Sequence, residues 1–198
     1  MIGRLSEKIV SYLIAFETIP EAERELYQYG VFLLISQILY FTVTLIFGFA
    51  LGIVFESIVF FIAFQSIRQI AGGYHATTET RCEILSAGAI LLSLIFIKIV
   101  NENALFTYIL AIALVCASVI FLLAPLDTVQ RLLSDNEYIA FRKKTRVILI
   151  VIITVIAVSY IMKINIVFTS CCTSLILEGF LLLVGKINRE SINSNTCE

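Results

Sequence analysis

The chain has 198 residues, of which 60% are hydrophobic and only 15% are charged. Soluble domains are about half apolar and about a quarter charged, and a small globule has too little interior to bury this many apolar side chains. The composition therefore excludes an ordinary soluble domain. It predicts an all-α polytopic membrane protein, because lipid cannot satisfy exposed backbone groups. A net charge of −1, without a basic stripe carrying aromatics, excludes nucleic acid as a partner.

The N-terminal segment, residues 1–30, is rich in charge and has no apolar core of the kind that a signal peptide needs. Between positions 5 and 19, apolar side chains recur at helical spacing: Leu5, Ile9, Tyr12, Leu13 and Phe16. This pattern predicts an amphipathic helix. Two placements are open, one at the membrane surface and one packed against the cytoplasmic loops like a helix of a soluble protein.

Six apolar runs of 15 to 21 residues follow, and a helix needs roughly 20 residues to cross a membrane. They cover residues 31–51, 53–67, 84–100, 104–123, 147–161 and 166–184. The first two are nearly continuous, and Gly48, Gly52 and Glu56 mark the only break between them. We therefore expect a single transmembrane domain over 31–184 and a polar tail over 185–198.

Lys and Arg residues gather in every second connection, namely the N-terminal segment, the loop around 68–83, the loop 125–146 and the tail. Only Lys98 and Lys163 belong to the opposite face. Because positive residues are retained on the cytoplasmic side, this bias predicts that both termini are cytoplasmic.

The five cysteines do not suggest a disulfide framework or a metal site, since their number is odd and their spacing matches no ligand set. Cys116, Cys171 and Cys172 fall inside apolar runs, where free cysteine behaves as a small hydrophobic residue. No phosphate-binding loop is visible either, and no cofactor is expected.

The loop 68–83 holds the residues that could carry chemistry. His75 is the only histidine of the chain, and Cys82 follows seven residues later. An imidazole can activate a thiol by taking its proton. Either one continuous helix places both side chains on one face, or Thr80 caps the next helix and Cys82 lies in its first turn, where the helix dipole favours a thiolate. Gly72 and Gly73 break the chain before His75 and favour the second geometry.

This segment resembles the signature of the accessory gene regulator B family, the AgrB-like membrane endopeptidases of Gram-positive bacteria. The matching pattern is Arg68-x3-Gly72-Gly73-x-His75-Ala76-x5-Cys82, and Ala124-Pro125 after the fourth span is a further similarity. The likeness extends over essentially the whole chain. One departure is Thr128-Val129-Gln130-Arg131, where many members have Asn-Lys-Pro.

The resemblance implies a function. Such proteins cut a precursor peptide of the AgrD type on the C-terminal side of the future signal, and they help to close a thiolactone or lactone ring for quorum sensing. It implies Cys82 as nucleophile and His75 as base, with Arg68, Gly72 and Gly73 supporting the site. It also implies a multi-pass protein of the bacterial cell membrane whose partners are the precursor and membrane lipid, and with which self-association is compatible.

Several alternatives stay open. The chief rival is a small membrane transporter or exporter without peptidase activity, and another is a non-catalytic membrane subunit. Arg68 could instead anchor the chain at lipid headgroups. The basic residues of loop 125–146 could set the topology beside anionic lipid, or could dock an acidic part of the precursor. The oxyanion donor is either Arg68 or the amides at the start of the third span, and Gln65, Gln69 and Glu79 are candidates to orient His75.

Overall fold

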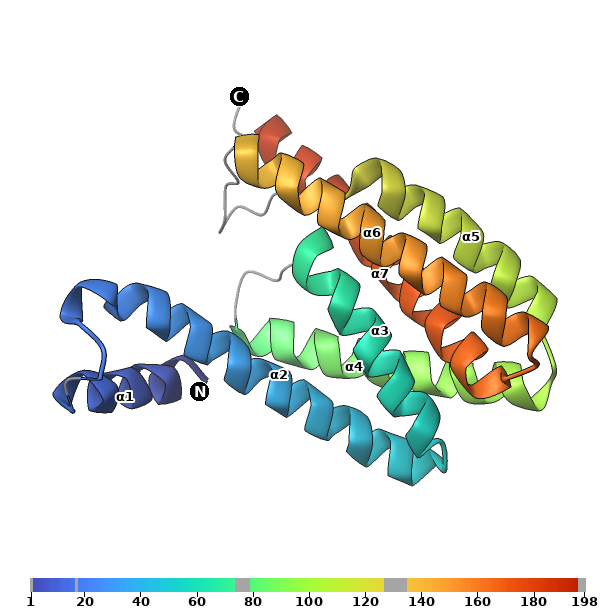
Figure 1. The fold of residues 1–198 in the computed structure, drawn as a ribbon, viewed down its shortest axis with the longest axis horizontal. Helices are drawn as coiled ribbons and strands as arrows, with labels where there is room; N and C mark the ends of the chain where they lie inside the picture. Colours follow the sequence, from blue (N-terminus) through green and yellow to red (C-terminus); the bar gives the residue numbers. More distant parts are fainter. Residues whose placement is uncertain (1, 17, 74–78, 127–134, 196–198) are drawn as a thin grey trace. The chain divides into compact units, whose positions relative to one another are not determined.

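The computed structural model describes residues 2–16, 18–73, 79–126 and 135–195. Within these ranges every regular element is a helix, and a single isolated bridge is the only extended pairing (Figure 1). The elements are α1 (Ile2–Ala15), η1 (Glu21–Glu23), α2 (Arg24–Leu51), α3 (Val54–Ala71), α4 (Glu79–Glu102), α5 (Phe106–Leu123), α6 (Asp135–Ile161) and α7 (Asn165–Asn195). The predicted all-α fold is confirmed.

In the described residues, six helices are long and apolar enough to cross a membrane, and each predicted span lies within or almost within one of them, α2 to α7. The break between the first two spans falls at Gly52, whose φ of 75° is costly for other residues. The N–H of Ile53 then donates to the carbonyl of Gly48 at 2.9 Å, and α3 begins at Val54. The polytopic architecture is therefore confirmed, including the boundary that the sequence marked only weakly.

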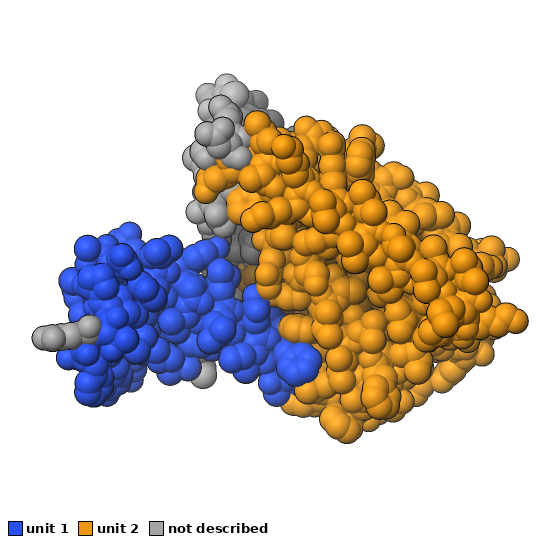
Figure 2. Space-filling model, in the orientation of Figure 1, with its two compact units in different colours: residues 1–43 blue, residues 44–198 orange. Residues whose placement is uncertain are grey.

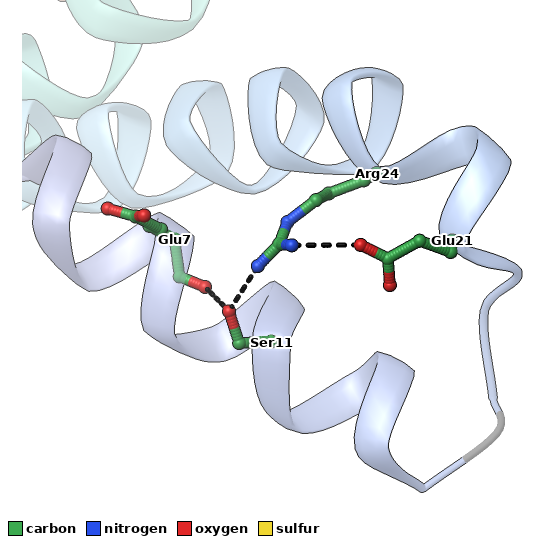
Figure 3. A network of polar contacts seen from close by, with 4 residues as sticks. All are labelled: Glu7, Ser11, Glu21 and Arg24. Atoms are coloured by element: carbon green, nitrogen blue, oxygen red, sulfur yellow. Dashed lines mark hydrogen bonds and ion pairs between the residues drawn. The ribbon is translucent and has the colours of Figure 1, made fainter.

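The chain divides into two compact units, Met1–Val43 and Thr44–Glu198, coloured separately in Figure 2. In the first unit, polar contacts tie α1 to the start of α2. The guanidinium of Arg24 donates to Glu21 Oε1 at 2.9 Å and to Ser11 Oγ at 2.8 Å, and Ser11 Oγ donates to the carbonyl of Glu7 at 2.8 Å (Figure 3). These contacts stabilise the reversal of the chain between the two helices.

Helix α1 confirms the amphipathic helix predicted near the N-terminus. Of the five apolar side chains that define the predicted face, Leu5, Tyr12 and Phe16 are exposed. A helix that lies in a membrane interface presents such a face to lipid. Helix α1 therefore has the apolar face that the interfacial placement requires.

In the second unit, α7 is the central helix and packs against α3, α4, α5 and α6. Figure 1 shows α5, α6 and α7 side by side. Buried side chains of these three helices and of α3 form one apolar core. It includes Ile67, Ile120, Leu149, Phe168, Leu175 and, as predicted for small hydrophobic residues, Cys171 and Cys172. Gly179 lets α7 approach α5 closely, since a Cβ on it would lie only 2.8 Å from Cys116 Cβ.

Helix α6 begins earlier than its apolar run predicted. Arg142, Lys143, Lys144 and Arg146 were expected in a loop, but they lie on this helix, which starts at Asp135. The prediction was wrong here because it used hydrophobicity alone, whereas Lys and Arg are themselves good helix formers. The Arg146 guanidinium lies 4.4 Å from the centre of the Phe121 ring, which joins the basic turn of α6 to α5.

Candidate active site

Helix α3 ends in a turn made by two glycines. Gly72 has a φ of 75° and Gly73 a φ of 124°, both in the region that glycine adopts without steric cost. The N–H of Gly72 still donates to the carbonyl of Arg68 at 3.3 Å, and the helix stops there. The predicted break of the chain just before His75 is therefore confirmed.

Arg68 lies one turn before this break, and its side chain folds back onto it. The Nη1 group donates a hydrogen bond to the carbonyl oxygen of Gly72. The same Nη1 lies 3.9 Å from Oε1 of Glu178 on α7, and the Arg68 side chain is only 16% exposed. This position favours a role inside the protein over the anchoring at lipid headgroups that the sequence left open.

Glu178 was missed by the sequence analysis, which assigned it to the sixth span. Its side chain is fully buried, and neither carboxylate oxygen accepts a hydrogen bond from the described residues. A charge inside a membrane span is costly unless it is paired, so such residues tend to serve a function. The signal was present in the sequence, because Glu178 is the only charged residue in the run 166–184.

The segment that follows α5 closes the turn from a third side. The N–H of Leu126 donates to the carbonyl of Ala71 at 2.9 Å, and Leu126 pairs with Gly72 as an isolated bridge. A Cβ on Gly72 would lie 2.5 Å from the Leu126 carbonyl oxygen. The space beside Gly72 is therefore taken by the protein's own chain. The buried Ala124-Pro125 pair, noted for its likeness to AgrB proteins, leads directly into this contact.

Gly73 is enclosed between Arg68 and α7. A Cβ on Gly73 would collide with the Arg68 guanidinium and would lie 3.5 Å from the carbonyl oxygen of Leu181. Two helices, α3 and α7, and the segment that follows α5 thus meet at this turn. We call Arg68, Gly72, Gly73, Leu126 and Glu178 the Arg68 cluster.

Cys82 lies on the next helix. It is the fourth residue of α4, in the first described turn, and its free thiol is half-buried. The expected cap at Thr80 is wrong, since Thr80 is itself helical and a capping residue must stand just outside the helix. No hydrogen bond or ion pair joins Cys82 to the Arg68 cluster among the residues that the structure describes.

His75 lies outside the described residues. The structure therefore brings together Arg68, Gly72 and Gly73 and places Cys82 on α4, with His75 in the connection between α3 and α4. In the described part of the chain, no group of three or more His, Cys, Asp or Glu side chains could hold a metal ion.

The fold and this site define a multi-pass helical membrane protein in which a tightly packed turn follows the second span. The family model described as accessory gene regulator B, AgrB, matches residues 6–182, which include every residue of the site. The chain belongs to this family, and its members process AgrD quorum-sensing peptides. No curated protein and no solved structure matches the chain.

Proposed function

We propose that this chain is a membrane cysteine endopeptidase that cleaves an AgrD-like precursor on the C-terminal side of the signal and promotes cyclisation of the released part. The observation that carries the proposal is the Arg68 cluster, found in a chain of the AgrB family. In this cluster Arg68, Gly72 and Gly73 pack together in the turn that ends α3. His75 follows that turn two residues later in the sequence. The proposed nucleophile, Cys82, opens the following helix.

The first half of the proposed reaction is acyl transfer to the enzyme. The Cys82 thiolate attacks the carbonyl carbon of the scissile peptide bond and forms a C–S bond. The tetrahedral intermediate then collapses, and the C–N bond breaks as His75 gives a proton to the leaving amine. The products are an acyl-thioester on Cys82 and a free C-terminal fragment.

The second half closes the ring. A Cys or Ser side chain of the bound acyl part attacks the thioester carbon while His75 takes its proton. The bond between the acyl carbon and the Cys82 sulfur then breaks, which releases the Cys82 thiolate and gives a thiolactone or a lactone. Exchange of one thioester for another is nearly neutral in energy, so no cofactor is required. Water would hydrolyse the intermediate, and the half-buried position of Cys82 on a membrane-spanning helix supports its exclusion.

The oxyanion that forms during attack needs hydrogen-bond donors. The guanidinium of Arg68 already serves the Gly72 carbonyl and faces Glu178. The first N–H groups of a helix have no partner within that helix, and Cys82 lies in the first described turn of α4. We therefore favour the α4 amides as the oxyanion donors.

The proposed topology places both termini, the Gly72-Gly73 turn and Cys82 on the cytoplasmic side, where a precursor peptide is made. Membrane lipid and the precursor are the proposed partners, and self-association in the membrane is compatible with this arrangement. The exposed Lys143 and Lys144 on α6 would then lie beside anionic headgroups.

Co-expression with an epitope-tagged candidate precursor, encoded by a neighbouring gene, tests the proposal. The wild-type chain should shorten the peptide, whereas Cys82→Ala and His75→Ala should leave it full length. Cys116→Ala is the matched control, since this cysteine lies within the span α5. Processing by a membrane-inserted Cys82→Ala protein would refute the mechanism. Export of an uncut peptide by the wild type would favour the transporter.

A further inference from the structure

Glu178 is the one charged residue of the Arg68 cluster that the family signature of Arg68, Gly72, Gly73, His75 and Cys82 does not contain. It occupies a position near the middle of α7, the helix against which α3, α4, α5 and α6 all pack. Its carboxylate is completely buried. An isolated carboxylate in such a place is strongly disfavoured. A buried carboxylate is therefore expected to have a positively charged partner and to serve a function.

The geometry identifies the partner. Oε1 of Glu178 lies 3.9 Å from Nη1 of Arg68, which is beyond hydrogen-bond length but close enough for a strong charge interaction in a buried setting. The same Nη1 group donates to the Gly72 carbonyl. The Glu178 carboxylate therefore faces Nη1 of Arg68, the same atom that donates to the Gly72 carbonyl. Its effect on the Gly72-Gly73 turn is exerted through Arg68.

The surroundings leave the guanidinium little freedom. Gly73 packs so closely against it that a single added methyl group would collide with it, and the Leu181 carbonyl of α7 lies next to the same position. On the other side of the turn, Leu126 holds Ala71 and Gly72 by backbone pairing. A shift of Arg68 would therefore be transmitted to the direction in which the chain leaves Gly73.

We propose that Glu178 is a positioning residue for the peptidase reaction: it holds the Arg68 guanidinium under the Gly72 carbonyl, and so sets where the chain segment bearing His75 begins. This inference rests on the proposed function. The central helix α7, which is remote in sequence from the segment between Arg68 and Cys82, thereby helps to position that segment.

The test compares Glu178→Gln with Ser174→Ala. Ser174 is buried on α7 one turn away, and its hydroxyl donates a hydrogen bond to the carbonyl of Cys171 in its own helix. Misplacement of a reacting group by about 1 Å costs about 100-fold in rate, so Glu178→Gln should lower kcat for precursor cleavage by about 10- to 100-fold. KM for the precursor should change little, and Ser174→Ala should resemble the wild type in both constants.

A second readout separates positioning from stability and needs no peptide. In a chain that keeps Cys82 as its only cysteine, the rate of alkylation by iodoacetamide reports thiolate formation. Glu178→Gln should slow alkylation towards the rate of His75→Ala, while a purely structural role would reduce the yield or the melting temperature and leave this rate unchanged. Slow alkylation with reduced kcat supports the proposal.

A double variant serves as a second test. If Glu178→Gln does not insert, the double variant Arg68→Gln/Glu178→Gln removes both charges, and it should insert yet remain as slow as the single variant is predicted to be. Wild-type rates in either variant would overturn the inference and leave the peptidase intact. Cleavage by Cys82→Ala would instead overturn the proposed function itself.

Discussion

Nη1 of Arg68 lies 3.9 Å from Oε1 of Glu178, so a charge at the end of α3 meets an opposite charge near the middle of α7. The pair is largely shielded from solvent, since the Glu178 side chain is fully buried and that of Arg68 is only 16% exposed. Because Arg68 also holds the Gly72 carbonyl, the ion pair links the core of the helical unit to the turn that precedes His75. The ion pair and the turn should therefore respond together to substitution.

Substitutions of Arg68 and Glu178 should have strongly non-additive effects on the free energy of unfolding. Arg68→Ala leaves the Glu178 carboxylate buried without its partner, and removal of one member of a buried pair costs roughly 3–5 kcal/mol. Arg68→Ala/Glu178→Gln should be more stable than Arg68→Ala alone, because no uncompensated charge remains. Thermal unfolding of the wild type, the two single variants and the double variant in detergent micelles measures this coupling. Additive effects of the two substitutions would mean that the charges do not interact.

The second prediction concerns Gly73. An Ala at this position places a Cβ against the Arg68 guanidinium, at a φ of 124° that Ala rarely adopts. Precursor cleavage should fall by about 10-fold or more, as expected when a reacting group is displaced. Gly88→Ala on α4 is the control, since its Cβ would meet nothing within 4 Å beyond the backbone of its own helix, among the residues that the structure describes. Full activity of Gly73→Ala would show that the turn does not need this close approach.

The third prediction separates Cys82 from the other cysteines. Cys171 and Cys172 are buried in the apolar core, whereas Cys82 is half-buried at the start of α4. A chain in which Cys116, Cys171, Cys172 and Cys197 are replaced by Ala or Ser should retain cleavage. It should lose that cleavage when Cys82 is alkylated with iodoacetamide. Cleavage that survives complete alkylation would rule out Cys82 as the nucleophile.

Much of the fold, but only part of the site, could be predicted from the sequence. Apolar runs and the Gly72-Gly73 pair are local signals, and they gave the six helices and the end of α3. Glu178 could not be assigned to the site, because its significance depends on a contact between α3 and α7 that no local pattern encodes. The paired backbones of Gly72 and Leu126 escaped prediction for the same reason. The start of α6 was missed because a charged helical turn resembles a polar loop when only hydropathy is considered.

The fourth prediction tests the proposed topology. Glu102 is the exposed last residue of α4, and Lys144 is an exposed residue in the first half of α6. The charge bias assigns these two residues to opposite sides of the membrane. In a cysteine-free chain, Glu102→Cys should react with a membrane-impermeant maleimide added to intact cells. Lys144→Cys should react only after the cells are permeabilised. The reverse pattern would place Cys82 outside the cell and contradict cleavage in the cytoplasm.

The most direct test of the central claim is to detect the acyl-enzyme itself. The precursor would carry Ala in place of its internal Cys or Ser, so that the ring cannot close and the thioester on Cys82 accumulates. Intact-mass measurement after acid quenching should show the chain heavier by the N-terminal fragment less one water, and neutral hydroxylamine should remove the added mass. The Cys82→Ala protein should show neither adduct nor cleavage. Cleavage of the precursor by the wild type without any adduct at early times, or an adduct that persists in Cys82→Ala, would contradict the account.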